Sequence, residues 1–598
     1  MTVDEKIEAL RARMKSNKVD MYYIPTDDFH FSEYVSDYFK CREFISGFNG
    51  SAGTVVVSMN EAGLWTDGRY YIQAEQQLKG SSITLYKSGL EGVPKIKDYI
   101  IDRMEKGDVL GCDGMVVSTT WAEDMKKSLE AKGAEIDCGL DLVDDIWEDR
   151  PALKSKPVML LDNCYCGETR ESKIQRLRNY MDENGADYHV ITSLDDIAWL
   201  LNIRGNDIHC NFVVLSYLVI SSDKIWLFAD CEAFGNEVRK ALEDVGVILM
   251  PYNAIYPYMQ SISAGSRIML DKNIVNQAIT ESFNEGVKII DMVNPTVLWK
   301  AVKNDIEIRN MKLAHIKDGV AVTKFIYWIK KNIGKTAMTE LSVIDKLEKI
   351  RNKGENYKGP SFDTIAGFGE HGAIVHYSAS KETDVVIEPD NLLLVDTGGH
   401  YLEGTTDVTR TILIGNNATD EQKKYYTAVL RGNLNLCNAH FMYGCSGVSL
   451  DYLARQPLWD MGCNYNHGTG HGVGYLLNVH EPPNAFRFRV LPFAGENAVL
   501  EEGMITSDEP GMYFEGKFGI RLENLILCVK HEKTNYGQFM GFEPLTYVPF
   551  DKDVIDTKQM SDKEKELLND YHKKVYEKIS PHLEDDEKEW LEEACAPI

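Results

Sequence analysis

The sequence has no run of about 20 apolar residues, the length that a helix needs to cross a lipid bilayer. It also has no Cys-x-x-Cys pair, and the nearest approach to one is Cys164-Tyr165-Cys166. The glycine-rich stretch at residues 46–53 is followed by no lysine, so the Gly-x-x-x-x-Gly-Lys-Ser/Thr motif of a phosphate-binding loop is absent. These absences argue against a membrane-spanning protein, a disulfide framework and a P-loop nucleotide-binding protein.

Positive charge is scarce relative to negative charge. The chain has 65 Lys and Arg residues against 92 Asp and Glu residues, which gives a net charge of −27. Binding to nucleic acid or to an anionic membrane needs a basic surface, so we expect neither partner. The twelve cysteines are scattered, which is typical of a reducing compartment. The chain starts with an acidic amphipathic helix rather than a signal peptide, and we expect a cytoplasmic protein.

The first half of the chain contains an internal repeat. A helix expected at residues 3–17 and a strand expected at residues 20–24 recur as a helix at residues 171–184 and a strand at residues 187–191. A repeat of this kind predicts two related α/β domains. The chemistry is not repeated, because the second copy has no equivalent of the Asp67-Gly68-Arg69 turn.

The repeat and a proline-containing linker at residues 149–157 divide the chain. We expect a first α/β domain at residues 1–155, a second, related one at residues 156–297, and a third domain at residues 298–598. In the third domain helices alternate with apolar strand-like runs, which indicates an α+β domain. A capping box at Thr419 and Gln422 predicts a helix that continues to about residue 440.

Four acids and one histidine interrupt the apolar runs of the third domain in short polar or glycine-rich breaks. Carboxylate oxygens and an imidazole nitrogen are ligands for divalent cations. Any one of these acids is more readily explained as a turn residue or an exposed strand residue, but five such residues in this order indicate a metal site. They are Asp396, Asp407, His471, Glu509 and Glu523.

Two antiparallel pairs of strands are expected to bring the acids together. The expected strands are residues 391–396 with 405–413, and residues 504–509 with 519–529. Folding each pair about its midpoint places Asp396 near Asp407 and Glu509 near Glu523, because opposed residues of antiparallel strands share a face. The two pairs would hold two divalent cations about 3.5–4 Å apart, with His471 as the single nitrogen ligand.

The spacing of His467 and His471 would put both on one face of a helix, as in some zinc proteases. The segment also contains three glycines, each of which weakens a helix interior by about 1 kcal/mol, so we expect a loop or a strand. Arg521 lies two residues before Glu523, on the same face of the expected strand. An arginine there would offset the repulsion among the carboxylates and orient a ligand.

The order of these motifs resembles the pita-bread metallopeptidases, which include methionine aminopeptidase, prolidase and aminopeptidase P. The motifs are Asp396, Asp407, His467-Gly-Thr-Gly-His-Gly472, Asp508-Glu-Pro-Gly511 and Arg521-Leu-Glu-Asn524. The details are most similar to the aminopeptidase P (Xaa-Pro aminopeptidase) family in its long, three-domain form. The similarity covers nearly the whole chain, and further matching stretches are residues 65–70, 374–377, 478–481 and 542–546.

The resemblance implies a fold and an activity. The fold would be α/β, with two related amino-terminal α/β domains followed by a pita-bread catalytic domain of two αβ halves related by pseudo-twofold symmetry. The activity would be release of the first residue from peptides with proline in the second position. The resemblance also implies two divalent metal ions, most readily Mn2+ with Zn2+ or Co2+ as alternatives, and a homodimer.

The resemblance further implies roles for individual residues. His376 would contact the substrate, His480 would bind the substrate and polarise the scissile carbonyl, and His467 would be a third active-site histidine. Glu509 would move a proton as well as bind metal, and Arg69 of the first domain would contact the peptide. The remaining histidines of this region are assigned to packing or to the surface, namely His371, His400 and His440.

Two other functions fit the same motifs. A prolidase, which cuts only Xaa-Pro dipeptides, has a closely related site, but the doubled amino-terminal domain argues against it. A catalytically inactive peptide-binding protein of the same fold is disfavoured because all five metal-site residues and three histidines are retained. We expect Xaa-Pro-Yaa and longer peptides to be cleaved faster than Xaa-Pro dipeptides.

Overall fold

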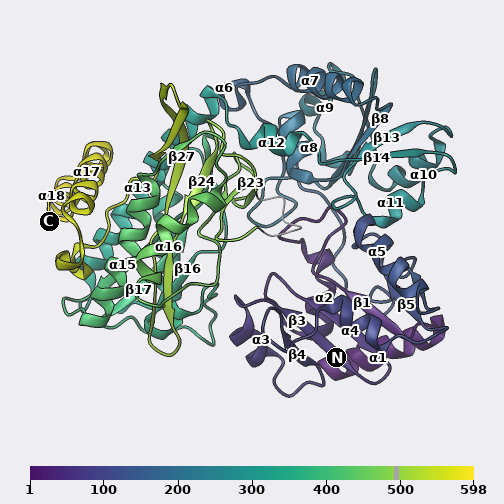
Figure 1. Cartoon of the computed structure of the whole chain (residues 1–598), viewed down its shortest axis with the longest axis horizontal. Helices are drawn as coiled ribbons and strands as arrows, with labels where there is room; N and C mark the ends of the chain where they lie inside the picture. Colours follow the sequence, from purple (N-terminus) through teal and green to yellow (C-terminus); the bar gives the residue numbers. More distant parts are fainter. Residues whose placement is uncertain (491–496) are drawn as a thin grey trace. The chain divides into compact units, whose positions relative to one another are not determined.

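The structure is a computed structural model that describes residues 1–490 and 497–598. The chain forms two compact units, which are described here one at a time (Figure 1). The first unit comprises Met1–Leu161 and Thr169–Thr296, and the second comprises Asp162–Glu168 and Val297–Ile598.

The first unit begins with a mixed six-stranded sheet. In sheet order its strands are β4 (Thr84–Lys87), β3 (Ala62–Thr66), β2 (Thr54–Ser58), β1 (Met21–Ile24), β5 (Val109–Cys112) and β6 (Glu135–Asp137). Helices cover both faces of this sheet. They are α1 (Val3–Asn17), α2 (Cys41–Ser46), α3 (Tyr71–Gln77), α4 (Ile96–Arg103) and α5 (Thr119–Glu130).

Alternation along β2 explains how this sheet buries both faces. Val55 and Val57 pack with Leu10 of α1, whereas Val56 packs with Ile100 of α4. Successive side chains of a strand point to opposite faces, so an apolar strand with helices on each side contributes to two cores. The α1 helix begins at a capping box formed by Thr2 with the helix's third residue, which explains its sharp start after two residues.

A second six-stranded sheet of the first unit repeats the first. In sheet order its strands are β12 (Val247–Pro251), β11 (Ile225–Ala229), β10 (Ser216–Ser221), β8 (Tyr188–Ile191), β13 (Arg267–Leu270) and β14 (Lys288–Asp291). In both sheets the second and third strand pairs of this order are antiparallel, and the other three are parallel. The identical order and direction confirm the duplicated α/β fold that the repeat predicts.

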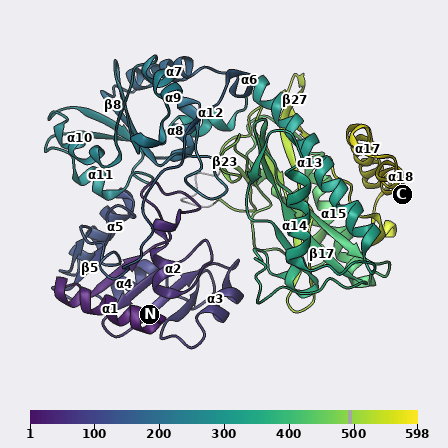
Figure 2. The same ribbon diagram turned by 180° about the vertical axis from the view of Figure 1, so that it is seen from behind.

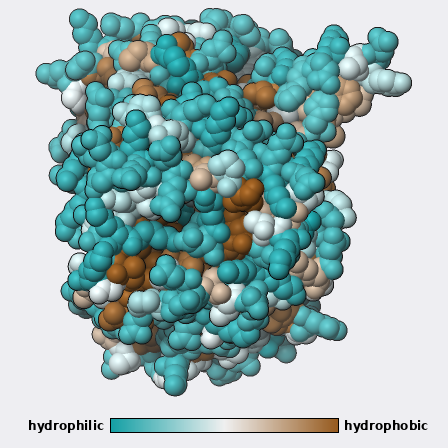
Figure 3. Space-filling view, turned by 90° about the vertical axis from the view of Figure 1, so that its left-hand side faces the viewer, coloured by the Kyte–Doolittle hydropathy of each residue, from teal (hydrophilic) through white to brown (hydrophobic). Residues whose placement is uncertain are grey.

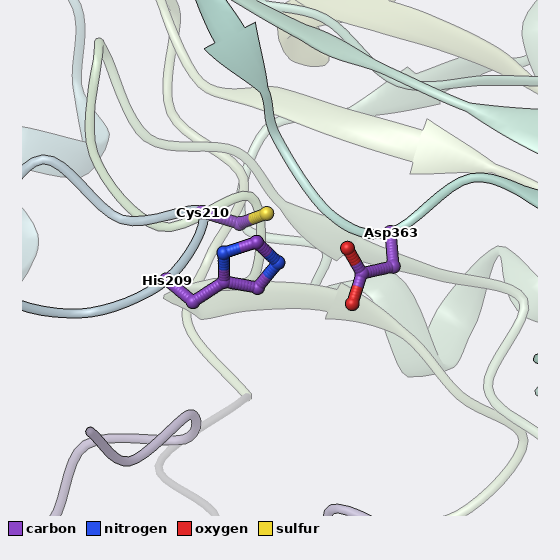
Figure 4. A group of neighbouring side chains, drawn as sticks. All are labelled: His209, Cys210 and Asp363. Atoms are coloured by element: carbon purple, nitrogen blue, oxygen red, sulfur yellow. The ribbon is translucent and has the colours of Figure 1, made fainter. Parts of the chain in front are cut away.

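The remaining elements of the first unit surround the second sheet. The helices are α7 (Arg170–Glu183), α8 (Leu194–Leu201), α9 (Asn236–Glu243), α10 (Ile255–Ser261) and α11 (Gln277–Glu281). A short pair of strands, β7 (Met159–Leu160) and β9 (Ile203–Arg204), adds a small antiparallel ladder. His209 and Cys210 lie between β9 and β10, and Cys210 has a positive φ of 57° (Figure 4).

The second unit is built from antiparallel strands and long helices. Its main helices are α13 (Asp305–Asn332), α14 (Glu340–Arg351), α15 (Asp420–Cys437), α16 (Asp451–Trp459), α17 (Asp562–Ile579) and α18 (Asp585–Ala594). The shorter α6 (Asn163–Cys166) packs on α13, and α12 (Thr296–Ala301) precedes it. Helix α15 ends before the expected residue 440, because residue 440 begins strand β21 (His440–Met442), which pairs with another strand.

Two sheets form the two halves of the second unit. The first contains β16 (Ile365–Phe368), β17 (Asn391–Thr397) and β20 (Val408–Ile414). The second contains β21 (His440–Met442), β28 (Gly537–Pro544), β27 (Asn524–Thr534), β24 (Ile505–Asp508), β22 (Gly470–Gly472) and β23 (Glu481–Phe486). Smaller ladders are β15 (Tyr357–Pro360) with β18 (Gly399–Tyr401) and β19 (Gly404–Thr405), and β25 (Gly511–Phe514) with β26 (Phe518–Arg521).

Each half packs its own helices on its own sheet. Phe325 of α13 and Leu347 of α14 share a core with Leu393 of β17, and these two helices lie side by side in Figure 2. Ala454 of α16 shares another core with Ile526 of β27. The two helix-on-sheet halves meet the expectation of paired αβ halves around antiparallel strands.

The carboxyl terminus lies beside α18 at the edge of the second unit (Figures 1 and 2). The face that carries α17 and α18 is mostly hydrophilic, with separate apolar patches (Figure 3). Among the described residues, no helix combines the length and the apolar composition that crossing a membrane requires.

Candidate metal centre

Asp396 and Asp407 lie at the end of the first half's sheet. In the register of β17 and β20, Asp396 is opposite Thr409 and Thr397 is opposite Val408. The sequence predicts that Asp396 lies near Asp407, and, besides burial, the negative charge of Asp396 does raise the pKa of Asp407. The residue directly opposite Asp396, however, is two positions beyond Asp407. The cause is a further pair of short strands, β18 and β19, which leaves the sheet between the two aspartates and pairs with β15.

Glu509 and Glu523 lie at the corresponding end of the second half's sheet. The last pair of the β24–β27 ladder is Asp508 opposite Asn524, so the next position on each strand is a glutamate. The β25–β26 hairpin connects them, with its turn at the expected residues 515–517. The ladder register brings Glu509 and Glu523 together, as the sequence predicts.

His471 lies in β22 between the two pairs of acids. Its Nε2 is 3.5 Å from Asp407 Oδ2 and 3.5 Å from Glu509 Oε1. One ligand atom each of Asp407, His471 and Glu523 lies within 4.8 Å of the other two. His467 lies in a loop and His471 in a strand, as expected from the three glycines of this segment.

The tautomer of His471 follows from its hydrogen bond. Its Nδ1 lies 2.9 Å from the carbonyl oxygen of Gly472, and a carbonyl can only accept. Nδ1 therefore carries the proton, and Nε2 presents its lone pair toward Asp407 and Glu509. This arrangement is the one that metal-binding histidines use, because the backbone fixes the ring while the other nitrogen binds the metal.

Several carboxylate oxygens of the centre are buried and lack a hydrogen-bond partner among the described residues. They are Asp396 Oδ1, Asp407 Oδ1 and Glu523 Oε1. An unpaired buried carboxylate is costly, and buried charges are normally paired or bind a metal. The donor set of four carboxylates and one imidazole therefore fits divalent cations.

The raised pKa values of the carboxylates also indicate a cation site. Burial, with the negative charge of Glu523, raises the pKa of Asp407 well above its usual range. Burial and Glu523 likewise raise the pKa of Glu509. Burial and Asp396 raise the pKa of Glu523 to about 7. Without cations these carboxylates would retain protons, and bound cations would displace them.

Arg521 stabilises the opposite side of the centre. Its Nη2 donates to Asp396 Oδ2 at 2.6 Å, and its Nη1 donates to the hydroxyl of Tyr513 at 2.7 Å. The expectation that Arg521 and Glu523 share one strand is wrong, because β26 ends at Arg521 and β27 starts at Asn524. The break in the strand directs Arg521 to Asp396, which is 125 residues away in the sequence.

His467 is linked to the centre through Tyr513. Its Nδ1 donates to the carbonyl of Gly468 at 2.8 Å, and its Nε2 is 2.9 Å from the hydroxyl of Tyr513. Burial, with the positive charge of Arg521, lowers the pKa of His467 to about 3. The ring is therefore neutral at physiological pH, and its Nε2 accepts a hydrogen bond from the hydroxyl of Tyr513.

His480 lies beside His471, and the segment that contains His376 lies beside Arg521. The ring of His480 is perpendicular to that of His471, with centroids 4.3 Å apart. His376 follows Val375, whose carbonyl accepts from Arg521 Nη2 at 3.3 Å. The segment of His376 thus joins the hydrogen-bond network around Asp396.

The structure places Arg69 in the first unit, after β3. Its Nε and Nη2 donate to the two carboxylate oxygens of Asp67 at 2.9 and 2.8 Å. This bidentate pair orders the Asp67-Gly68-Arg69 turn, which the second copy of the fold lacks.

Two hydroxyl groups of the centre were missed in the sequence. Thr409 donates to Glu523 Oε2 at 2.8 Å, and Ser507 donates to Glu509 Oε1 at 3.2 Å. Thr409 is two residues after Asp407, and Ser507 is two residues before Glu509. Because strand side chains repeat with a period of two, this spacing was the signal that could have found them.

Comparison with known proteins agrees with this geometry. Residues 309–530 match metallopeptidase family M24, and residues 538–598 match the C-terminal region of that family. Residues 6–144 and 149–307 each match a Creatinase/Prolidase N-terminal domain. Two amino-terminal domains of one kind precede the catalytic domain, as the two sheets of identical order indicate.

Two relatives match nearly the whole chain. A probable Xaa-Pro aminopeptidase P from Laccaria bicolor is 38% identical over 608 residues, which cover 99% of this chain and 93% of the relative. Aminopeptidase P2 from Arabidopsis thaliana is 38% identical over 637 residues, which cover 100% of this chain and 89% of the relative.

A solved structure extends the similarity to the fold. The crystal structure of X-prolyl aminopeptidase from Caenorhabditis elegans, described as a cytosolic enzyme with a di-nuclear active site, is 34% identical to this chain. The two superimpose with a TM-score of 0.94, and the match covers 100% of both chains. The chain therefore belongs to metallopeptidase family M24, and within it to the long, three-domain aminopeptidase P family with its pita-bread catalytic fold.

Proposed function

We propose that this chain is a metal-dependent exopeptidase that releases the N-terminal residue from peptides with proline in the second position. The observation that carries the proposal is the assembly of Asp396, Asp407, His471, Glu509 and Glu523 around buried carboxylate oxygens that lack hydrogen-bond partners in the described residues. The assembly lies in a chain that is 38% identical to a probable Xaa-Pro aminopeptidase P over 99% of its length.

These five residues are the proposed ligands of two divalent cations. The di-nuclear active site of the Caenorhabditis elegans enzyme supports the number. When bound, the cations would supply a water of lowered pKa and polarise the scissile carbonyl. The oxygen-rich donor set suits Mn2+ by ligand type, although Zn2+ binds more tightly in general, and Zn2+ or Co2+ are the alternatives.

Glu509 is the proposed proton carrier. Ser507 donates a hydrogen bond to its carboxylate, and burial raises its pKa, which makes the carboxylate a stronger base. Glu509 takes the proton of the attacking water and passes it to the leaving nitrogen. Its Oε1 lies 3.5 Å from His471 Nε2, so the proposed proton carrier belongs to the same group of side chains as the proposed metal ligands.

Of the three other histidines, two contact the substrate in this proposal and one supports the metal centre. His480, perpendicular to His471, donates to the oxygen of the scissile carbonyl as negative charge develops there. His376 contacts the peptide from the segment that Arg521 tethers. His467 remains neutral and, through Tyr513, holds Arg521 against Asp396.

The proposed specificity for proline in the second position has a basis in the chemistry of the peptide bond to proline. The bond to proline has no N–H, and the ring fixes φ. A peptidase that recognises this N–H fails at proline, whereas a pocket shaped for the ring succeeds. Arg69 is the proposed contact to the peptide chain beyond the metal centre, with Asp67 holding its guanidinium in place.

We also propose that the chain has three domains, at residues 1–155, 156–297 and 298–598. We propose a cytoplasmic location, because the structurally similar relative is described as cytosolic. None of the twelve cysteines, all of which are described, forms a disulfide, which agrees with a reducing compartment. The net charge of −27 continues to argue against nucleic acid as a partner.

We also propose a homodimer, because the surface of the second unit carries an exposed cluster of aromatic side chains. Tyr452 and Trp459 of α16 and Phe488 are 54%, 39% and 42% exposed. Their rings are adjacent, with centroids 5.9 Å apart for Tyr452 and Trp459 and 6.2 Å apart for Trp459 and Phe488. Contiguous exposed aromatic side chains are typical of an interface, and a second copy of the chain would bury them.

Steady-state kinetics on three peptides tests the activity. With added Mn2+, Arg-Pro-Pro should be cleaved fastest, Arg-Pro much more slowly, and Arg-Ala-Pro should lose most of the rate. A dipeptide places a carboxylate immediately beyond proline, in a centre that already holds four carboxylates. If Arg-Pro is turned over fastest, the protein is a prolidase. If no peptide is cleaved by protein that binds metal, it is an inactive peptide-binding member of the family.

A further inference from the structure

A second group of metal-binding side chains lies on the surface of the second unit, apart from the centre described above. His440 is the first residue of β21, and His531 and Glu532 lie in the distal part of β27. One ligand atom from each lies within 4.8 Å of the other two. His440 Nε2 is 3.4 Å from Glu532 Oε1, and the centroids of the two imidazoles are 5.4 Å apart.

A β-bulge directs His531 and Glu532 to the same place. Lys530 pairs with Met540, and the next pair is Lys533 with Gln538, so β27 advances three residues while β28 advances two. Neighbouring residues of a regular strand point to opposite faces, and a bulge removes that restriction. Gln538 Nε2 donates to the carbonyl of His531 at 2.9 Å, which holds the bulge in place.

Gly541 lets His531 reach His440. Strand β28 lies between β21 and β27, and its Gly541 is opposite His440. A Cβ at position 541 would lie 2.4 Å from Nε2 of His531, so the imidazole lies directly over the glycine. The ring of His440 stacks on Phe539, with centroids 4.9 Å apart and planes 15° apart, which fixes its orientation. Both imidazoles are therefore held by contacts other than the ones they make with each other.

The donor set of this group differs from that of the first centre. Two imidazole nitrogens and one carboxylate oxygen are ligands that zinc takes, with a fourth tetrahedral position left for water. The first centre, with four carboxylates, is oxygen-rich. We propose that His440, His531 and Glu532 bind one zinc-class divalent cation that links β21 to the β27–β28 hairpin. This site does not depend on the proposed peptidase function.

Zinc uptake by matched variants tests the site. The full-length protein, His440→Asn, His531→Asn and the control His582→Asn are dialysed against Zn2+, and bound zinc is counted by elemental analysis. His582 is exposed and belongs to no such group among the described residues. His440→Asn and His531→Asn should each bind one zinc fewer per chain than the original protein and the control. Hydrolysis of Arg-Pro-Pro with added Mn2+ should be the same in all four.

Gly541→Ala provides a second variant that keeps all three ligands. The three atoms nearest to the new Cβ all belong to the imidazole of His531, at the end of a side chain that can move, so we expect the fold to be retained while the ring is displaced. The dissociation constant for this zinc should rise by about tenfold or more, the effect expected when a ligand loses its support. Equal zinc counts in the original protein and the two histidine variants would overturn the site. An unchanged dissociation constant in Gly541→Ala would contradict it as well.

Discussion

The guanidinium of Arg351, in α14, donates from Nε and Nη2 to the two carboxylate oxygens of Asp318, in α13, at 2.8 and 3.0 Å. Both side chains are buried. Arg351 also donates to the hydroxyl of Thr397, and the hydroxyl of Thr406 donates to Asp318 at 2.8 Å. These threonines directly follow Asp396 and precede Asp407, so one buried ion pair holds the chain behind both aspartates of the metal centre.

Asp318→Ala should therefore destabilise the protein and loosen the metal centre together. Removing one partner of a buried ion pair leaves the other charge uncompensated and costs about 3–5 kcal/mol. Urea unfolding measures the loss, and metal analysis should show weaker retention. Asp345→Ala is the control, because its ion pair with Lys349 is largely exposed and contributes little. Equal unfolding midpoints for the two variants would contradict the role of the buried pair.

Asp407→Ala tests metal binding in the candidate centre. The side chain contributes two carboxylate oxygens, one of which lacks a hydrogen-bond partner in the described residues and one of which faces His471. Bound metal and peptide hydrolysis should fall together when it is removed. The measurement is elemental analysis beside the rate on Arg-Pro-Pro. A variant that keeps two metals per chain with normal turnover would remove Asp407 from the ligand set.

Alanine substitutions of His480 and of His471 should differ in their effect on the amount of bound metal. His480→Ala should retain metal and reduce kcat/KM by about 10²–10⁴, the range for loss of a proton-transfer or oxyanion-stabilising group. His471→Ala should lose metal, because its Nε2 faces the carboxylates of Asp407 and Glu509. The two roles are reversed if His480→Ala strips the metal and His471→Ala does not.

The stability of the metal-free protein should depend on pH because of the raised pKa of Glu523. Its folded pKa of about 7 lies above its ordinary value of 4.5. The protonated folded form therefore contributes stability that is fully present below about pH 4.5 and is lost as the pH rises through about 7. Metal binding requires the deprotonated carboxylate, so metal affinity should rise over the same interval.

Thermal melts of the metal-free protein between pH 5 and 8, beside Glu523→Gln, check this prediction. The amide resembles the protonated acid and does not titrate, so the variant should lose part of the pH dependence in this interval. Identical pH profiles for the two proteins would show that Glu523 does not titrate there.

The aromatic cluster on α16 predicts the oligomeric state. Light scattering should give about twice the chain mass of 67.7 kDa. Trp459→Lys places a charge within the cluster and should shift the protein toward the monomer. Tyr536→Lys is the control, since Tyr536 is 83% exposed and lies in the turn between β27 and β28. A single-chain mass for the unmodified protein would contradict the dimer.

The sequence by itself determined the elements and the motif order. Capping residues mark the starts of helices, as Thr419 with Gln422 does for α15, because a cap acts within four residues. The repeated pattern of residues 3–24 and 171–191 was enough to predict two α/β domains of one kind. The pairing of Glu509 with Glu523 also followed from the sequence, since a single hairpin connects them.

Tertiary structure decided what depends on long-range register. The sequence predicts that Asp396 lies near Asp407, but the small hairpin between them places Thr409, two residues beyond Asp407, directly opposite Asp396. Arg521 meets Asp396 across 125 residues, and the three residues His440, His531 and Glu532 converge only because β27 carries a bulge. Side-chain periodicity specifies which face a residue occupies, whereas strand pairing, inserted hairpins and bulges specify which distant residue it meets.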